Sequence, residues 1–123
     1  IRIEVFMKEQ GFENEFDDID TISHHIVVFD EGKPIGTCRF FKENNHYTIG
    51  RVAVLKEYRN QHIGNLLLES AENEIKKLNG DLIVVHAQVR VSPFYEKQGY
   101  IQFGQIDDDE GVPHMWMKKK IQY

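Results

Sequence analysis

The feature that most constrains the fold is an apolar segment, a polar turn, an amphipathic helix and a second apolar segment in direct succession. Residues 46–55, HYTIGRVAVL, have the composition of a strand. From Ile63 onward, apolar residues recur with the 3.6-residue period of one helix face, and Asn79–Gly80 ends the pattern. Residues 81–87, DLIVVHA, are continuously apolar, as expected for a strand covered on both faces. This order predicts a right-handed unit of two parallel strands joined by a helix.

The residues before this unit are expected to form short helices and then an antiparallel hairpin. Apolar spacing predicts a short helix over 1–10 that stops at Gly11, and the acidic segment 12–25 predicts a structured loop or a second short helix. Two β-rich runs then flank residues 30–34, DEGKP, where Gly32 and Pro34 supply turn angles. We therefore expect a hairpin that leads into the strand 46–55.

The part after the unit predicts a helix and two closing strands. Ser92 is expected as the N-cap of a short helix, with Pro93 at its first position. The strands are expected over 100–106 and 114–120, with DDDEGVP as the loop between them. We found no internal repeat or linker, which predicts one α/β domain over 1–123.

Composition argues against nucleic-acid binding, membrane association and a fold stabilised by disulfides. The chain has 123 residues and a formal net charge of -5, which argues against a nucleic-acid-binding surface. Its apolar runs fall short of the roughly 18 residues that predict a transmembrane helix, so we expect no membrane association. The single cysteine, Cys38, excludes an internal disulfide and favours a cytoplasmic setting. Because the chain does not start with Met, we expect a first strand to be missing from its N-terminus.

The turn before the long helix has the features of a phosphate-binding loop. A helix start presents unpaired N–H groups and the positive end of the helix dipole, which attract anions. Here the turn brings Arg59, carries no acidic residue between Arg59 and Leu68, and contains Gly64, beside which a ligand can approach the backbone. The alternative is an ordinary turn in which Asn60 caps the helix and Arg59 faces water. Neither a Walker motif nor a dinucleotide glycine triplet is present.

Two separated motifs resemble the GNAT superfamily of acetyl-CoA-dependent N-acetyltransferases, in particular its small bacterial single-domain branch. The signature of this family begins with Gln or Arg. Any two residues follow, then a Gly, then any one residue, and the motif ends with Gly or Ala. Arg59 and Gly64 match its ends, whereas His62 stands where the first glycine is usual. The sequence RVAVLKEYRNQHIGNLLLE followed by FYEKQGY matches the paired signature, and the resemblance extends over nearly the whole chain.

The resemblance implies an α/β fold of the GNAT type and a cosubstrate. The expected sheet is mixed, has about six to seven strands with helices on both faces, and is splayed between the family's fourth and fifth strands. Acetyl-CoA is the implied cosubstrate, and no metal is expected. Its pantetheine arm would pair with the fourth strand and its pyrophosphate would bind the turn, so the implied residues are Val52, Ala53, Val54, Arg59, Asn60, Gln61, His62, Ile63, Gly64 and Asn65.

The implied reaction is direct attack of a neutral amine on the acetyl thioester. Tyr95 lies at the family's usual position for the acid that protonates the departing thiolate, although an aromatic core residue is the alternative. No carboxylate lies in the strand where many relatives keep a glutamate. The expected base is His114, with His86 and Glu110 as the other candidates, and a hydrogen-bonded structural histidine is the alternative.

The sequence does not identify the acceptor amine, and it leaves two other functions as alternatives to acetyl transfer. The acidic runs 13–20 and 107–110 would attract a cationic amine if both rim the cleft, but solvated loops explain them equally. A small-molecule or peptide amine is the expected partner. The rival functions are a non-catalytic acyl-CoA-binding sensor and a dimerising scaffold that pairs through the closing strand HMWMKK, so a homodimer is also left open.

Overall fold

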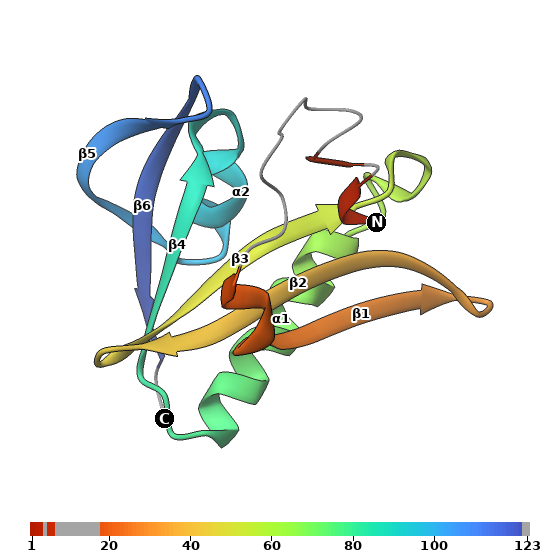
Figure 1. Cartoon of the computed structure of the whole chain (residues 1–123), viewed down its shortest axis with the longest axis horizontal. Helices are drawn as coiled ribbons and strands as arrows, with labels where there is room; N and C mark the ends of the chain where they lie inside the picture. The colour runs from red at the N-terminus through yellow and green to blue at the C-terminus, as the bar shows by residue number, and fades with distance from the viewer. Residues whose placement is uncertain (4, 7–17, 122–123) are drawn as a thin grey trace.

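The computed structural model describes residues 1–3, 5, 6 and 18–121, which build a six-stranded sheet in the order β1-β2-β3-β4-β6-β5 (Figure 1). Neighbouring strands are antiparallel except β3 and β4, which are parallel. The strands are β1 (His24–Asp30), β2 (Lys33–Glu43), β3 (His46–Val54), β4 (Leu82–Gln88), β5 (Ile101–Asp109) and β6 (Val112–Lys120). The helices are α1 (Ile63–Lys77) and α2 (Ser92–Lys97), with short 3-10 turns η2 (Asp18–Thr21), η3 (Lys56–Tyr58) and η4 (Val89–Val91).

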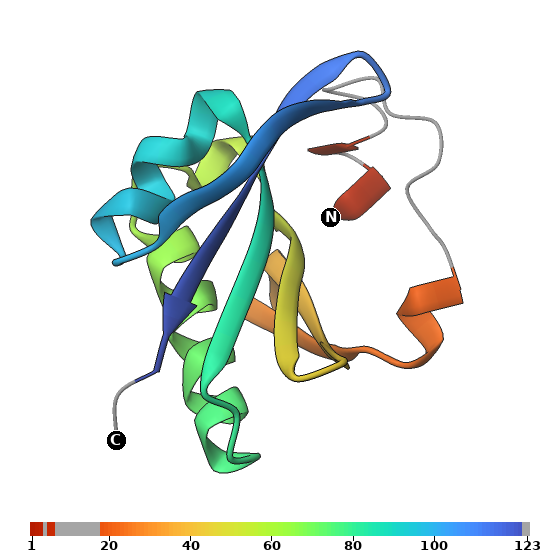
Figure 2. The ribbon, with the colours of Figure 1, turned by 90° about the vertical axis from the view of Figure 1, so that its left-hand side faces the viewer.

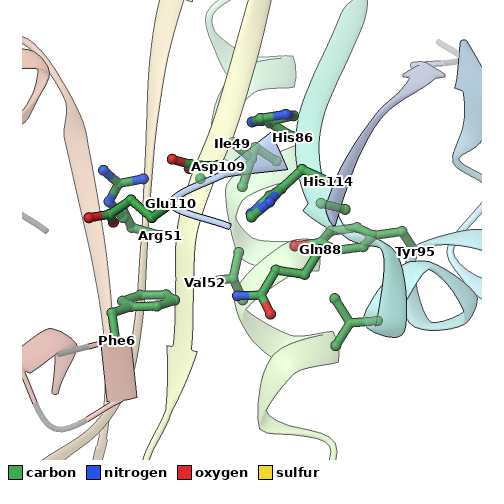
Figure 3. A pocket seen from close by; sticks show the side chains of 13 residues that line it. Phe6, Ile49, Arg51, Val52, His86, Gln88, Tyr95, Asp109, Glu110 and His114 are labelled. Carbon is green, nitrogen blue, oxygen red and sulfur yellow. The ribbon is translucent and has the colours of Figure 1, made fainter. Parts of the chain in front are cut away.

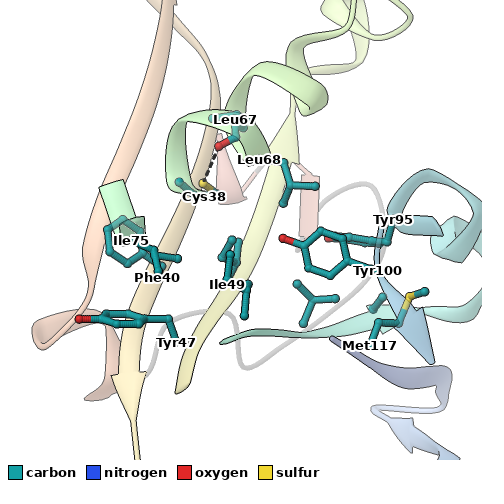
Figure 4. Close-up of a cluster of buried hydrophobic side chains, with 14 of the residues drawn as sticks. Cys38, Phe40, Tyr47, Ile49, Leu67, Leu68, Ile75, Tyr95, Tyr100 and Met117 are labelled. Atoms are coloured by element: carbon teal, nitrogen blue, oxygen red, sulfur yellow. Dashed lines mark hydrogen bonds between the residues drawn. The ribbon is translucent and has the colours of Figure 1, made fainter. Parts of the chain in front are cut away.

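The core lies between the sheet and α1. Figure 2 shows α1 and α2 on one face of the sheet, and η2 with the first residues on the other. Leu67, Leu68 and Ile75 of α1 are fully buried, and burial of each such side chain contributes about 1.5–3 kcal/mol to stability. They pack against alternate residues of the strands, among them Phe40, Ile49, Ile83, Val85 and Met117 (Figure 4). The parallel pair joined by α1 confirms the unit predicted from residues 46–87.

The C-terminal end of α1 also confirms its sequence signal. The Gly80 N–H donates to the Ile75 carbonyl at 2.9 Å, and the Asn79 N–H donates to Lys76 at 3.0 Å. These two bonds and the left-handed φ of 64° at Asn79 form a Schellman motif. At Gly80 a Cβ would lie 2.5 Å from Ile75 Cγ2 and 2.8 Å from Tyr47 Cδ2, so packing requires glycine there.

The parallel strands β3 and β4 separate after a short paired stretch. Their partners are Tyr47–Ile83, Thr48–Val84 and Ile49–Val85, and the strands diverge beyond these (Figure 1). On the other side of β3 the register shifts, because Thr37 pairs with Ala53 but Arg39 pairs with Gly50. Two residues of β3 therefore lie opposite Cys38 alone, which is a bulge, and a bulge bends its strand.

A glycine inside a strand often marks a bulge, as Gly50 within HYTIGRVAVL would predict, but this bulge is centred one residue further on, at Arg51. Arg51 has a left-handed φ of 52°, whereas a Cβ at Gly50 would contact nothing within 4 Å. The strands that separate are those expected as the family's fourth and fifth. We call the gap between them, from Gly50 to Val54 and from His86 to Gln88, the β3–β4 split.

Two of the hairpin turns, between β1 and β2 and between β5 and β6, are tighter than predicted. Glu31 and Gly32, with φ of 49° and 84°, form the first turn, and Pro34 lies in β2 opposite Phe29. Glu110 and Gly111, with φ of 51° and 81°, form the second. Two residues with positive φ form the type I′ turn that matches strand twist. The expected loop DDDEGVP is therefore mostly strand.

Two further expectations are wrong. Ser92 is the first residue of α2, and the preceding Val91 makes no side-chain cap bond. The closing strand β6 lies between β4 and β5, so it is not an edge available for pairing with a second copy. The edges of this sheet are β1 and β5.

The first residues are fixed to the sheet by an ion-pair cluster. Asp20 accepts from Arg2 Nη1 at 2.6 Å and from the buried Arg39 Nη1 at 3.0 Å. The Val5 N–H donates to the Ile1 carbonyl at 3.0 Å, a helical spacing that agrees with the helix expected over 1–10. Residues 4 and 7–17, which include much of that expected helix and most of the first acidic run, lie outside the described residues.

Candidate active site

Two hollows lie along the β3–β4 split and mark the candidate site. The first, which we call the cleft pocket, has a volume of about 190 Å³ and lies between β3, β4 and the β5–β6 turn (Figure 3). The second, which we call the helix-start hollow, has a volume of about 300 Å³ and lies at the beginning of α1. Val52 lines the first and Val54 the second, so β3 runs from one to the other.

The beginning of α1 leaves its backbone amides uncapped. The N-cap residue is His62, and no side chain caps the helix. The Leu66 N–H donates to the His62 carbonyl at 3.1 Å, so the amides of Ile63, Gly64 and Asn65 precede the first bonded turn. The alternative in which Asn60 caps the helix is therefore wrong. With no acidic residue in this turn, the helix start has the properties of an anion site.

The backbone of His62 explains why glycine is usual at that position of the motif. Its φ of 61° and ψ of 23° lie in the left-handed region, which costs a side-chain-bearing residue about 1–2 kcal/mol. Asn60 also has a positive φ, 66°, which asparagine tolerates better. The histidine thus keeps the loop conformation that a glycine would adopt without strain.

Gly64 lies in close contact with α2, so packing as well as access to the backbone favours a residue without a side chain. A Cβ at this position would lie 3.3 Å from Cζ of Phe94, an α2 residue that also lines the helix-start hollow. In this structure the glycine of the first motif therefore lies against the aromatic ring of the second. The sequence suggested only that a ligand needs this space.

Arg59 does not simply face water. Its Nε donates to the Val54 carbonyl at 3.1 Å, which fastens the turn to the end of β3. The side chain is half-buried and lines the helix-start hollow. It therefore contributes positive charge beside the uncapped amides.

Tyr95 enters the cleft pocket from α2 (Figure 3). Its side chain is 7% exposed and packs edge-on against Phe94 and Tyr100. Burial, and to a lesser extent the nearby Cys38 thiol, raises the pKa of the Tyr95 phenol well above its ordinary value. The phenol therefore stays protonated at neutral pH, as a proton donor must.

His114 and His86 lie next to each other in the same pocket. Nδ1 of the buried His114 lies 2.8 Å from the Val112 carbonyl. A carbonyl only accepts, so this nitrogen carries hydrogen and Nε2 carries the lone pair of the neutral ring. Nε2 of His86 donates to Asp107 Oδ1 at 2.8 Å, and its ring lies 4.8 Å from that of His114. This hydrogen bond lowers the pKa of the Asp107 carboxyl.

The expected residues divide between the two hollows. Tyr95, His114 and Val52 line the cleft pocket, together with the other base candidates His86 and Glu110. The helix-start hollow is lined by Val54, Arg59, Asn60, His62, Ile63, Gly64 and Asn65. Ala53 is buried within β3, and Gln61 is exposed outside both.

Several lining residues were not expected from the sequence. Phe6, Gln88 and Val91 line the cleft pocket, and so does Arg51. Asp109 and Glu110 line it too, so the second acidic run does reach the cleft. Strand alternation would have placed Gln88 on the same face as His86. Nothing in the sequence indicates that Phe6 reaches this site.

The described residues provide neither a reactive thiol nor a metal site. Cys38 is buried against the Leu67 carbonyl, and burial raises its thiol pKa to about 12, so it is not a nucleophile (Figure 4). Within residues 1–3, 5, 6 and 18–121, no group of at least three His, Cys, Asp or Glu side chains is arranged to hold a metal ion. Nor is any helix in this part of the chain long and apolar enough to cross a membrane.

A split parallel pair, with an uncapped helix start at one end and a tyrosine and histidines at the other, defines the class of acyl-CoA-dependent acyltransferases. The sequence profile of the acetyltransferase (GNAT) domain matches residues 2–121. The chain belongs to the GNAT acetyltransferase family. It is 34% identical over 122 residues to the uncharacterized N-acetyltransferase YjcF of Bacillus subtilis, covering 97% of this chain and 87% of YjcF.

Solved structures share the fold. An acyl-CoA N-acyltransferase from Pseudomonas aeruginosa superposes with a TM-score of 0.87 at 24% identity, covering 96% of this chain and 84% of that one. An aminoglycoside 6′-N-acetyltransferase complexed with coenzyme A gives a TM-score of 0.80 at 16% identity, covering 96% and 86%. These likenesses confirm the expected GNAT-type sheet.

Proposed function

We propose that this chain transfers the acetyl group of acetyl-CoA to a primary amine, without a metal and without a covalent acetyl-enzyme. The single observation that carries the proposal is the β3–β4 split, with uncapped amides at one end and a buried phenol at the other. The single buried Cys38 supports a reducing, cytoplasmic setting.

We assign CoA recognition to the helix-start hollow and the β3 backbone. The amides of Ile63, Gly64 and Asn65 would hold the pyrophosphate, and Arg59 would add positive charge there. Beyond Ile49, β4 no longer pairs with β3, so the backbone of residues 52–54 is the proposed partner of the pantetheine arm. The same strand is the proposed source of an N–H donor to the oxyanion.

We assign proton transfer to the cleft pocket. His114 accepts a proton from the acceptor ammonium at Nε2, and the neutral amine nitrogen then attacks the thioester carbonyl carbon. When the carbon–sulfur bond breaks, the thiolate takes the Tyr95 proton. The nitrogen then gives its second proton to the Tyr95 phenolate, which completes the amide and restores the phenol. The phenol suits this role because it is neutral at working pH, and His114 because the Val112 carbonyl orients its ring.

An amine panel tests the proposal. Purified protein, acetyl-CoA and a set of primary amines are mixed, and free thiol release is followed. We expect release with at least one amine, together with stabilisation of the protein by CoA on heating. Stabilisation without thiol release for any amine would instead identify a non-catalytic acyl-CoA sensor, and no stabilisation would reject both functions.

A further inference from the structure

The cleft pocket contains a carboxylate whose charge is not offset by a neighbouring group. Arg51 and Glu110 both line the pocket and carry opposite formal charges. Asp109 lines it too, and among the described residues its side chain makes no hydrogen bond or ion pair. With neutral histidines, the formal charge of the lining side chains is therefore negative.

A second polar group in the same pocket lacks a protein partner. The Tyr95 phenol is more than nine-tenths buried, and within the described part of the chain it has no hydrogen-bond partner. The phenol oxygen is not fully enclosed by protein atoms and Tyr95 lines the pocket, so a ligand bound there can accept its hydrogen bond. Figure 3 shows Tyr95 on one side of the pocket, with Asp109 and Glu110 on the other.

The hairpin determines which of its acidic residues faces the pocket. Asp107, Asp108 and Asp109 are consecutive in β5, opposite His114, Pro113 and Val112. Side chains alternate along a strand, so Asp107 and Asp109 share one face and Asp108 has the other. Accordingly, Asp107 bonds His86 and Asp109 lines the pocket, whereas Asp108 does not line it.

Resting on the proposed acetyl transfer, we infer that the acceptor is a small diamine, that is, a primary amine with a second positive charge. The amine that reacts lies near Tyr95 and His114, and Asp109 pairs with the distant ammonium. The reacting ammonium loses two protons, one to His114 and one that ends on the CoA thiol, and it gains the acetyl group, so the product of a diamine is a monocation. A pocket of about 190 Å³ suits a short aliphatic chain between the two nitrogens.

Three amines of similar length and different charge test the inference. Diaminobutane, butylamine and aminobutanoate are compared as acceptors by thiol release and as ligands of the CoA-loaded protein by calorimetry. Both measurements are made on the wild type, Asp109→Asn and Asp108→Asn. The last variant is a matched control, because it removes the same charge from the same hairpin outside the pocket.

We expect the wild type to prefer diaminobutane in kcat/KM and in affinity. Asp109→Asn lowers the ratio of diaminobutane to butylamine by about 1.5- to five-fold, the range of one exposed ion pair. Asp108→Asn leaves that ratio unchanged. A preference for aminobutanoate would show that Arg51 selects a carboxylate and would overturn the inference. An equal effect of both substitutions would also overturn it, because charge at a distance would then explain the preference.

The experiment distinguishes failure of the proposed acetyl transfer from failure of the inferred diamine acceptor. If the wild type releases no thiol with any amine, acetyl transfer is refuted, and calorimetry alone decides whether Asp109 selects a second charge. If thiol is released without a preference for the diamine, acetyl transfer stands and the inference is refuted. Thermal melts of both variants establish that each is folded.

Discussion

Removing the hydroxyl of Tyr95 or of Tyr100, one at a time, should separate the effect on catalysis from the effect on stability. The rings of Tyr95 and Tyr100 lie 5.7 Å apart at an angle of 77°, and both are buried. The Tyr100 hydroxyl donates to Glu72 Oε2 at 2.8 Å, and the other carboxylate oxygen accepts from Lys119 at 2.9 Å. The Tyr95 hydroxyl has no such partner among the described residues. Phenylalanine keeps either ring in place, so each substitution removes one oxygen only.

The expected losses follow from these contacts. Tyr95→Phe removes the proposed acid, a role worth about a hundred- to ten-thousand-fold in rate. It breaks no hydrogen bond, so the free energy of unfolding should stay within about 0.5 kcal/mol of wild type or rise. Tyr100→Phe removes a bond to a charged acceptor, which costs about 1.5–3 kcal/mol of stability, and it should leave kcat nearly unchanged.

Thiol release at saturating acetyl-CoA and urea unfolding measure the two quantities. Because the Tyr95 pKa is raised, the acid form persists as pH rises, and its ionisation should not reduce the wild-type rate below about pH 10. Full activity of Tyr95→Phe would refute the assignment. A fall in stability as large as that of Tyr100→Phe would show instead that the hydroxyl has a structural role.

Three further predictions concern the backbone, the thiol and the imidazole–carboxylate pair. His62→Gly should raise the free energy of unfolding by about 0.5–1 kcal/mol, more than Asn60→Gly, because it relieves a left-handed φ of 61°; an unchanged urea midpoint would contradict this. Cys38, with a pKa of about 12, should not react with a disulfide reagent at pH 8 until the protein unfolds, and rapid native labelling would refute its burial. Asp107 should titrate below its ordinary pKa in carboxyl NMR, and His86→Phe should raise that pKa. The stabilisation from this pair is present above about pH 4 and is lost as pH falls through the lowered pKa of Asp107. If Asp107 titrated identically in the wild type and in His86→Phe, the hydrogen bond between the two side chains would be contradicted.

Strong periodic patterns allowed the centre of the fold to be predicted. The apolar face of α1, the continuous apolar run of β4 and the Asn79–Gly80 ending all depend on local spacing, and the structure has all three. The hairpin turns were predicted too long. Turn positions depend on which residues take positive φ, and Glu31 and Glu110 do so without a glycine signal of their own.

The site was predictable where a motif is contiguous and less so where it depends on strand pairing. Residues of the helix-start hollow come from one short segment, so the motif located them. By contrast, the cleft pocket combines β3, β4, α2 and a distant hairpin. Which of Asp107, Asp108 and Asp109 faces it depends on the register with β6, and composition carries no such information.

The most direct test of the account is an amide NMR titration with coenzyme A. We predict that the largest shifts fall on the amides of Ile63, Gly64 and Asn65, with further shifts at Val52 and Val54 along β3. Pantetheine, which lacks the pyrophosphate, should shift the two β3 valines alone. Shifts confined to other parts of the chain, or an unchanged spectrum at saturating coenzyme A, would contradict it.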